Sequence, residues 1–173
     1  MSDVISHPAP ASAPRVGRLA SPRLAGLALA LPTSGVIAVA RYLTPSPTGI
    51  ETHLQLGLKP CFFLHLTGWP CPMCGMTTTF AWMAHGHPFT AAGTQPFGVV
   101  LFSLTLAGAI VGLLDLVTGR GIWASAWRVL APHERTLAGF LLGGLLLGWA
   151  YKCAVMHPEV VSAVVTTFTR GRT

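Results

Sequence analysis

Two cysteines separated by two residues are the strongest chemical signal in the sequence. Cys71 and Cys74 enclose Pro72 and Met73 and are followed by Gly75. Two thiolates at this spacing can bind one metal ion, and they can also form a reversible disulfide. The glycine permits a left-handed backbone conformation after the second cysteine. The motif therefore offers thiol chemistry, with metal binding and redox cycling both open.

Further ligands for a metal ion lie just before this motif. A tetrahedral structural zinc site has four protein ligands, so the cysteine pair needs two more. Cys61 and His65 have a C-x3-H spacing, and one helical turn would present both on one face. For Cys61, a ligand role and a structural role are equally compatible with the sequence, whereas Cys153 is expected to be a small apolar residue of a helix. The predicted metal ligands, with zinc as the candidate ion, are Cys61, His65, Cys71 and Cys74.

Other catalytic patterns are missing from the sequence. No paired carboxylates, Ser-His-acid set or phosphate-binding loop can be recognised, so no catalytic or cofactor-binding residue is assigned. His85 and His87 flank a glycine and precede a proline, which is more typical of a helix end than of a ligand pair. The sequence favours a stabilising metal or disulfide site over an enzyme. A thiol-redox membrane protein and an interaction module with purely structural cysteines are the alternatives.

The composition places this motif in a membrane protein. Only 9% of the 173 residues are charged and 51% are apolar, against roughly 25% charged residues in soluble domains. The net charge is +6. The basic residues stand at the ends of apolar runs and do not form one cluster, a distribution typical of membrane topology. We therefore expect the lipid bilayer as the partner and no binding to nucleic acid.

Three apolar runs are long enough to cross a bilayer, near 24–43, 97–118 and 136–156. Between the first two, Gly86, Pro88 and Gly93 interrupt the segment 60–96 that carries the cysteines. A helix from about 75 to 86 would be too short to cross roughly 30 Å of hydrocarbon, so we predict a half-buried, re-entrant helix packed among the spans. Residues 89–95 can form a second short helix. The predicted fold is an all-α integral membrane protein without a substantial sheet.

The remaining segments complete the predicted organisation. Residues 1–23 are expected to be a disordered tail, 24–156 the membrane domain, and 157–173 a C-terminal tail in which Pro158 can begin a short helix. The segment 119–135 carries several arginines, whereas 44–96 has Lys59 as its one strong base. By the positive-inside rule, we expect a multi-pass protein with a cytoplasmic N-terminus and the cysteine segment outside.

Small residues recur four positions apart in the last two spans. This spacing predicts close packing of the two spans as a hairpin, and it also offers faces for a homo-oligomer or another membrane protein. The pairs are Gly108 and Gly112, Gly139 and Gly143, and Gly144 and Gly148. Lys152, near the end of the last span, is expected to snorkel toward the headgroups. Asp115 is expected to pair with Arg120 or to be hydrated.

A longer pattern surrounds the cysteine pair. It reads TG-x-P-CP-x-CG-x-T and is followed by a short helix, a glycine, and an alanine and proline before the next span. The matching residues are Thr67, Gly68, Pro70, Cys71, Pro72, Cys74, Gly75, Thr77, Gly86, Ala92, Gln95 and Pro96. Over about residues 42–118, this pattern resembles the bacterial membrane proteins known as domain of unknown function 2752.

The resemblance implies a small multi-helix protein of the bacterial inner membrane with a cysteine motif and no established reaction. The upstream Cys61 also matches a cysteine of that family. Two positions depart from the pattern. Many relatives have Arg where this chain has Thr78, and many have Asn where it has Gln95.

Overall fold

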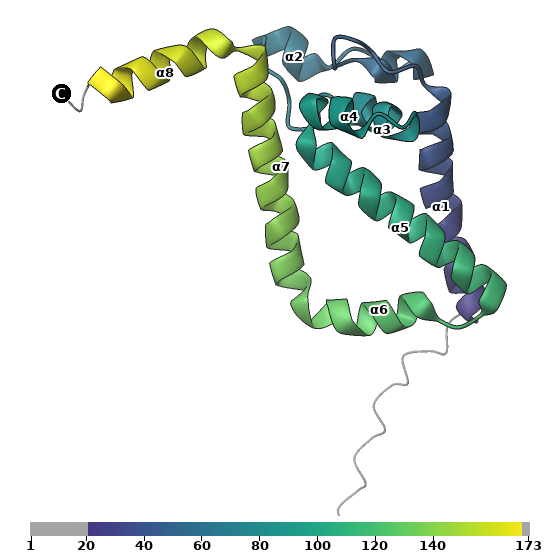
Figure 1. Cartoon of the computed structure of the whole chain (residues 1–173). Coiled ribbons are helices and arrows are strands. Elements are labelled where there is room, and N and C mark those ends of the chain that lie inside the picture. The colour runs from purple at the N-terminus through teal and green to yellow at the C-terminus, as the bar shows by residue number, and fades with distance from the viewer. Residues whose placement is uncertain (1–20, 171–173) are drawn as a thin grey trace, which may run out of the picture.

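The computed structural model describes residues 21–170, which form helices and connecting turns without any strand. The all-α prediction is confirmed (Figure 1). The helices are α1 (Pro22–Tyr42), α2 (Phe62–Thr67), α3 (Met76–Ala84), α4 (Pro88–Thr94), α5 (Pro96–Thr118), α6 (Ile122–Leu130), α7 (Glu134–Met156) and α8 (Pro158–Arg170), with 3₁₀ turns η1 (Thr52–Leu56) and η2 (Ala131–His133). Most of the predicted N-terminal tail, residues 1–20, and residues 171–173 lie outside the described part of the chain.

Three helical stretches are long and apolar enough to cross a membrane, as predicted. They are α1, α5 and the stretch Ile122–Met156, which contains α6, η2 and α7. The first begins two residues earlier than expected, because Pro22 suits the first turn and the Ser21 hydroxyl accepts a hydrogen bond from the Leu24 N–H. Figure 1 shows α1, α5 and α7 running between two ends of the molecule, with α6 crossing the lower end.

The closest helix packing joins α1 to α5. A Cβ atom on Gly26 would lie 2.6 Å from the Leu116 nitrogen, and one on Gly112 would lie 2.6 Å from the Ala30 nitrogen. The two backbones therefore touch where only glycine fits. The prediction that Gly108 and Gly112 face the last span is wrong, because this face of α5 is covered by α1.

The α7 helix meets α5 near one end. A Cβ atom on Gly144 or Gly148 would clash with the Phe97 side chain, at 2.7 and 2.9 Å. Around Gly139 and Gly143, no described atom outside the helix lies within 4 Å of such a Cβ. The predicted hairpin between the last two spans thus forms at the start of α5 and does not extend along both helices.

The turn from α5 into α6 is held by Asp115. Its carboxylate oxygens accept hydrogen bonds from the backbone N–H groups of Ile122 and Trp123, at 2.6 and 2.8 Å. These are orphan donors at the first turn of α6, and the positive end of the helix favours the buried carboxylate. The expected pairing with Arg120, or hydration, is wrong because the α6 N-terminus satisfies Asp115 instead.

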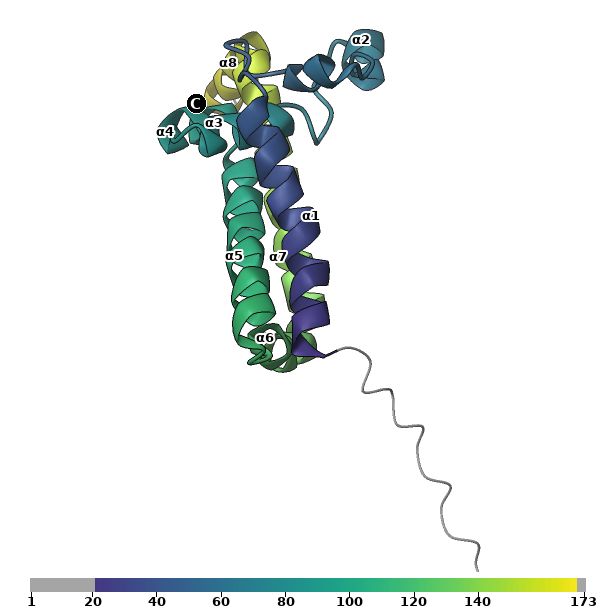
Figure 2. The same cartoon turned by 90° about the vertical axis from the view of Figure 1, so that its right-hand side faces the viewer.

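The short helices α2, α3 and α4 gather at the upper end of the molecule (Figure 2). The predicted helix near 75–86 is α3, and the predicted short helix near 89–95 is α4. The α3 helix packs against α1, α4 and α5, with Thr78, Thr79 and Ala81 buried. His85, which follows α3, has its Nε2 atom 3.1 Å from the carbonyl oxygen of Leu43 and therefore caps the end of α1.

Candidate metal centre

Two helix starts and the turn between them position the three cysteines of the segment. Cys61 precedes the first residue of α2, and Cys71 begins the turn that leads into α3. The Cys74 N–H donates to the Cys71 carbonyl at 2.9 Å and closes this turn. Gly75 then has a φ of 86°, the left-handed conformation that the sequence predicted. Local hydrogen bonding therefore folds the two cysteines of the motif toward each other.

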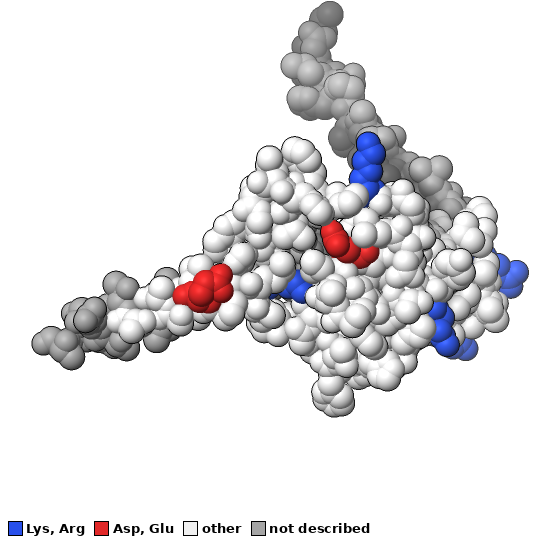
Figure 3. Space-filling model, turned by 90° about the horizontal axis from the view of Figure 1, so that it is seen from above, with Lys and Arg blue, Asp and Glu red and all other residues white. Residues whose placement is uncertain are grey.

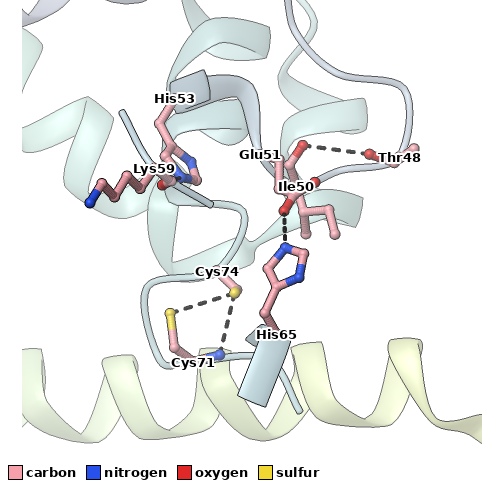
Figure 4. A network of polar contacts seen from close by, with 8 residues as sticks. All are labelled: Thr48, Ile50, Glu51, His53, Lys59, His65, Cys71 and Cys74. Atoms are coloured by element: carbon pink, nitrogen blue, oxygen red, sulfur yellow. Dashed lines mark hydrogen bonds and ion pairs between the residues drawn. The ribbon is translucent and has the colours of Figure 1, made fainter. Parts of the chain in front are cut away.

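The sulfur atoms of Cys61, Cys71 and Cys74 all lie within 4.8 Å of one another. The Cys71 thiol donates to the Cys74 sulfur at 3.5 Å, and the Cys71 N–H donates to the same sulfur at 3.3 Å (Figure 4). A tetrahedral zinc ion with Zn–S distances of about 2.3 Å requires sulfurs roughly 3.8 Å apart. The three thiols are thus close to the spacing of zinc ligands. Cys153 is not part of the cluster.

A cavity of about 250 Å³ opens beside the three thiols. It is polar enough to hold an ion, because a carboxylate, an imidazole and hydroxyl groups share its wall with the sulfurs. Its lining includes Glu51, His53, Cys61, Cys71, Cys74 and Thr77. A metal ion bound by the thiols would therefore face a space with further oxygen and nitrogen donors.

His65 lies one turn after Cys61 on α2, as predicted, but its ring is not part of the sulfur cluster. Its Nε2 atom lies 3.2 Å from Oε1 of Glu51 (Figure 4). Glu51 has a φ of 64° and is the only non-glycine residue among the described ones with a left-handed backbone. Because Glu51 engages Nε2, the Nδ1 atom of His65 is the one left for a metal ion.

The protein environment shifts the pKa values of Cys61 and Cys74 in opposite directions. The Leu64 N–H at the start of α2 donates to the Cys61 sulfur and, with smaller contributions from the other two thiols, lowers the pKa of Cys61. Burial, reinforced by the hydrogen bond that the protonated Cys74 thiol shares with the Cys71 sulfur, raises the pKa of Cys74 to about 12. Cys61 is therefore the more readily ionised thiol, and Cys74 keeps its proton at neutral pH unless a metal ion displaces it.

The upper end of α7 holds the cysteine segment in place through hydrogen bonds to backbone carbonyls. Trp149 Nε1 donates to Pro70 at 2.7 Å, and Tyr151 donates through its hydroxyl to Gly93 at 2.9 Å. Further along, His157 Nε2 lies 3.1 Å from the Gly68 carbonyl oxygen. These bonds could not be predicted from local sequence patterns, since the partners lie 58 to 89 residues apart in the chain.

Lys152 belongs to the same set of contacts. It is only 4% exposed, and its Nζ donates to the carbonyl oxygens of Gly49 at 3.1 Å and Thr94 at 3.3 Å. The prediction that it snorkels toward the headgroups is wrong, because the cysteine segment covers this turn of α7 and supplies the acceptors. A lysine in an apolar run was the one sequence signal that could have marked this contact.

The two departures from the family pattern are both buried. Thr78 and Gln95 are each 0% exposed. The hydroxyl groups of Thr78 and Thr52 lie 2.8 Å apart, so this position ties η1 to α3.

A second, apolar groove of about 480 Å³ runs between α1 and α3. Its wall includes Pro32, Val36, Val39, Leu43, Met76 and Phe80. Thr77 lines this groove and also the cavity beside the thiols. The apolar groove and the cysteine cavity thus share one residue of α3.

Comparison with known proteins is consistent with the resemblance. Residues 61–109 match the family model described as Protein of unknown function (DUF2752). The matched segment begins at Cys61, includes α2, α3 and α4, and ends within α5, so it contains the whole sulfur cluster. No curated protein and no solved structure matches the chain.

Proposed function

With residues 61–109 matching the DUF2752 family, we propose that the protein is a small multi-pass membrane protein whose thiol cluster binds zinc as a stabilising centre. The metal ion links α2 to the turn before α3, and through that turn to the spanning helices. In this role the site catalyses no reaction. The zinc ligands are Cys61, Cys71, Cys74 and His65.

The observation that carries this proposal is the convergence of three thiols from two separate turns. Cys61 lies ten residues before Cys71 in the chain, yet the sulfurs are within 4.8 Å. Free thiols have no strong attraction for one another, whereas three thiolates around a divalent ion gain several bonds at once. The three cysteines form no disulfide in the structure, so each sulfur can become a thiolate ligand when a metal ion displaces its proton.

His65 is the proposed fourth ligand. A rotation of its side chain toward the sulfurs is needed, because its ring lies outside the cluster. Glu51 already accepts from Nε2 at 3.2 Å. Metal-binding histidines commonly donate their second ring nitrogen to a carboxylate, which fixes the ring and strengthens the ligand. Glu51 would supply this support.

Metal analysis of the detergent-purified protein tests the proposal. We expect one zinc ion per chain, and its loss in Cys71→Ser. The matched control is Cys153→Ser, which removes a cysteine outside the cluster and should leave the zinc content unchanged. A wild-type protein purified with zinc in the buffer but without stoichiometric metal would refute the metal centre.

A disulfide between Cys71 and Cys74 is the second candidate, favoured by their sulfur separation of 3.5 Å. Since a disulfide requires about 2.05 Å, a small side-chain movement would allow it. Oxidation removes two electrons and two protons from the pair, and it needs an external two-electron acceptor. Mass spectrometry of the protein alkylated before and after reduction tests this candidate. Full alkylation of both cysteines without reductant would exclude it.

The bilayer placement and its orientation are part of the same proposal. Arg23, Arg120, Arg128 and Arg135 lie on the end of the molecule that carries α6, and this favours a cytoplasmic N-terminus in the bacterial inner membrane. The cysteine segment would then face the outside. A membrane-impermeant thiol reagent applied to intact spheroplasts should label an added cysteine at position 89 but not one at 127.

Association with a second copy, or with another membrane protein, through the glycines of α7 is also a proposal. Gly139 and Gly143 form an open small-residue face on α7. Cross-linking through cysteines introduced beside this face, in a Cys153→Ser background, would detect a symmetric pair.

A further inference from the structure

Lys152 is a buried ammonium group directly behind the cysteine turn. A Cβ atom on Gly75 would lie 3.2 Å from Nζ, so the ammonium lies beside the residue that follows Cys74. The carbonyl groups of Gly49 and Thr94 occupy two of its three donors. The upper end of the molecule seen from above carries few charged side chains, and they are scattered (Figure 3).

No carboxylate of the described chain pairs with this ammonium. The ion pairs among the described residues join His65 to Glu51 and His157 to Glu159. The Nζ atom of Lys152 faces the turn at Gly75, the residue directly after Cys74. A buried charge without a counter-charge is costly, since transfer from water to a low-dielectric interior is unfavourable for an isolated ion. In its charged form, Lys152 therefore has no counter-charge among the described residues 21–170.

A metal-loaded cluster supplies the missing negative charge. Three thiolates around a divalent ion carry one net negative charge, and a neutral histidine as the fourth ligand does not change it. An adjacent ammonium brings the total to zero. A monovalent ion would leave a negative charge in the same space, and a trivalent ion would leave a positive one.

We propose that Lys152 is the built-in counter-charge of the thiolate site, which makes the site selective for a soft divalent cation. This inference rests on the proposed metal centre and adds to it a residue outside the metal ligands. Lys152 is a positioning residue, because it acts through Cys74 and the backbone of the turn and does not touch the ion.

Zinc affinity of purified variants, measured by competition with a chromogenic chelator, tests the inference. We expect Lys152→Gln to weaken zinc binding roughly ten- to hundredfold, the range found for groups that support metal ligands from outside. Lys59→Gln is the matched control, since it removes the other lysine of the chain, which is exposed and near the site. It should leave the affinity unchanged.

A second pair of variants separates charge from structure. Lys152→Arg keeps the positive charge, whereas Lys152→Met keeps only a side chain of similar length without the charge. The arginine variant should therefore bind zinc more tightly than the methionine variant. Circular dichroism and intrinsic fluorescence show whether each variant folds. If the folded arginine variant binds as weakly as the methionine variant, the charge is not the cause and the inference is overturned.

The outcomes for the two proposals are distinguishable. If wild type binds zinc, Cys71→Ser does not, and Lys152→Gln binds like Lys59→Gln, the metal centre stands and the role of Lys152 is refuted. If wild type binds no zinc or cadmium at all, the proposed function fails first and this inference falls with it. If the ratio of zinc affinity to Cu(I) affinity is the same in wild type and in Lys152→Met, the charge argument alone is contradicted.

Discussion

The α1–α5 pair and the upper end of α7 are held in place by opposite means. Along α1 and α5, backbones touch at Gly26 and Gly112, and no polar side chain is needed. Along α7, Gly139 and Gly143 face open space, and the helix is fixed through hydrogen bonds near its end. The α1–α5 contact thus depends on close packing, whereas the contact between the cysteine segment and the upper end of α7 depends largely on polar bonds.

The largest effect is expected where the packing admits no side chain. Gly112→Leu would drive a side chain into the Ala30 backbone, 2.6 Å from where its Cβ must sit, so α1 and α5 must separate. We expect a loss of about 3 kcal/mol in the free energy of unfolding, measured by thermal or SDS-induced unfolding in detergent. Gly139→Leu, on a helix face without neighbours within 4 Å, should cost little. Equal losses would contradict the packing argument.

The next effect concerns the polar attachment of the cysteine segment. Trp149→Phe removes the donor to the Pro70 carbonyl and keeps most of the ring, so we expect a cost of about 1–2 kcal/mol. Hydrogen exchange should become faster in residues 68–74 and remain unchanged in α5. Trp127→Phe is the control, because this exposed tryptophan makes no indole hydrogen bond within the described chain. An increase in exchange that includes α5 would mean that the two regions are not independent.

A pH series of thiol alkylation would sharpen the description of the polar region. The lowered pKa of Cys61 gives it more thiolate at neutral pH than an ordinary cysteine, whereas Cys74, with a pKa raised to about 12, stays protonated. In the metal-free protein, we expect Cys61 to react first as pH rises and Cys74 last. Peptide mass spectrometry after brief alkylation between pH 6 and 10 measures the order. Faster reaction of Cys74 at every pH would contradict it.

The raised pKa of Cys74 determines whether metal binding strengthens or weakens as the pH rises. Because a zinc ion must displace the proton of Cys74, its apparent affinity should rise with pH throughout the neutral range and fall on acidification. A chelator competition at a series of pH values measures this slope. A flat profile would remove Cys74 from the ligands.

The smallest effect is expected at Glu51. Its left-handed backbone, at a φ of 64°, costs a non-glycine residue about 1 kcal/mol. Glu51→Gly relieves this strain and removes the contact to His65, so the apo protein should be unchanged or slightly more stable. Glu51→Gln keeps the strain and serves as the control. A large destabilisation by the glycine variant would show that the contact to His65 matters more than the backbone.

The sequence allowed prediction of features that depend on neighbouring residues. Apolar runs with a single charged residue each predicted α1, α5 and α7 to within two residues at every end, and Gly86 with Pro88 predicted the break between α3 and α4. The turn at Gly75 followed from the spacing of the motif. In each case the physical cause, whether desolvation or local backbone freedom, acts within a few residues.

What the sequence could not predict depends on which elements meet in space. Gly112 was recognised as a contact residue, but its partner is α1 and not the last span. Lys152 was assigned to the headgroups, although its acceptor Gly49 lies 103 residues away. The proximity of Cys61 to the motif likewise follows from how α2 is placed, and metal binding itself stays a prediction.

The position of Thr77 has a consequence for access to the thiols. This residue faces the apolar groove on one side and the cysteine cavity on the other. If the groove lies at the level of the hydrocarbon, Thr77 is a point at which the lipid phase and the thiol site come close together. A smaller side chain at this position would then favour the reaction of the thiols with reagents dissolved in the bilayer over their reaction with reagents dissolved in water.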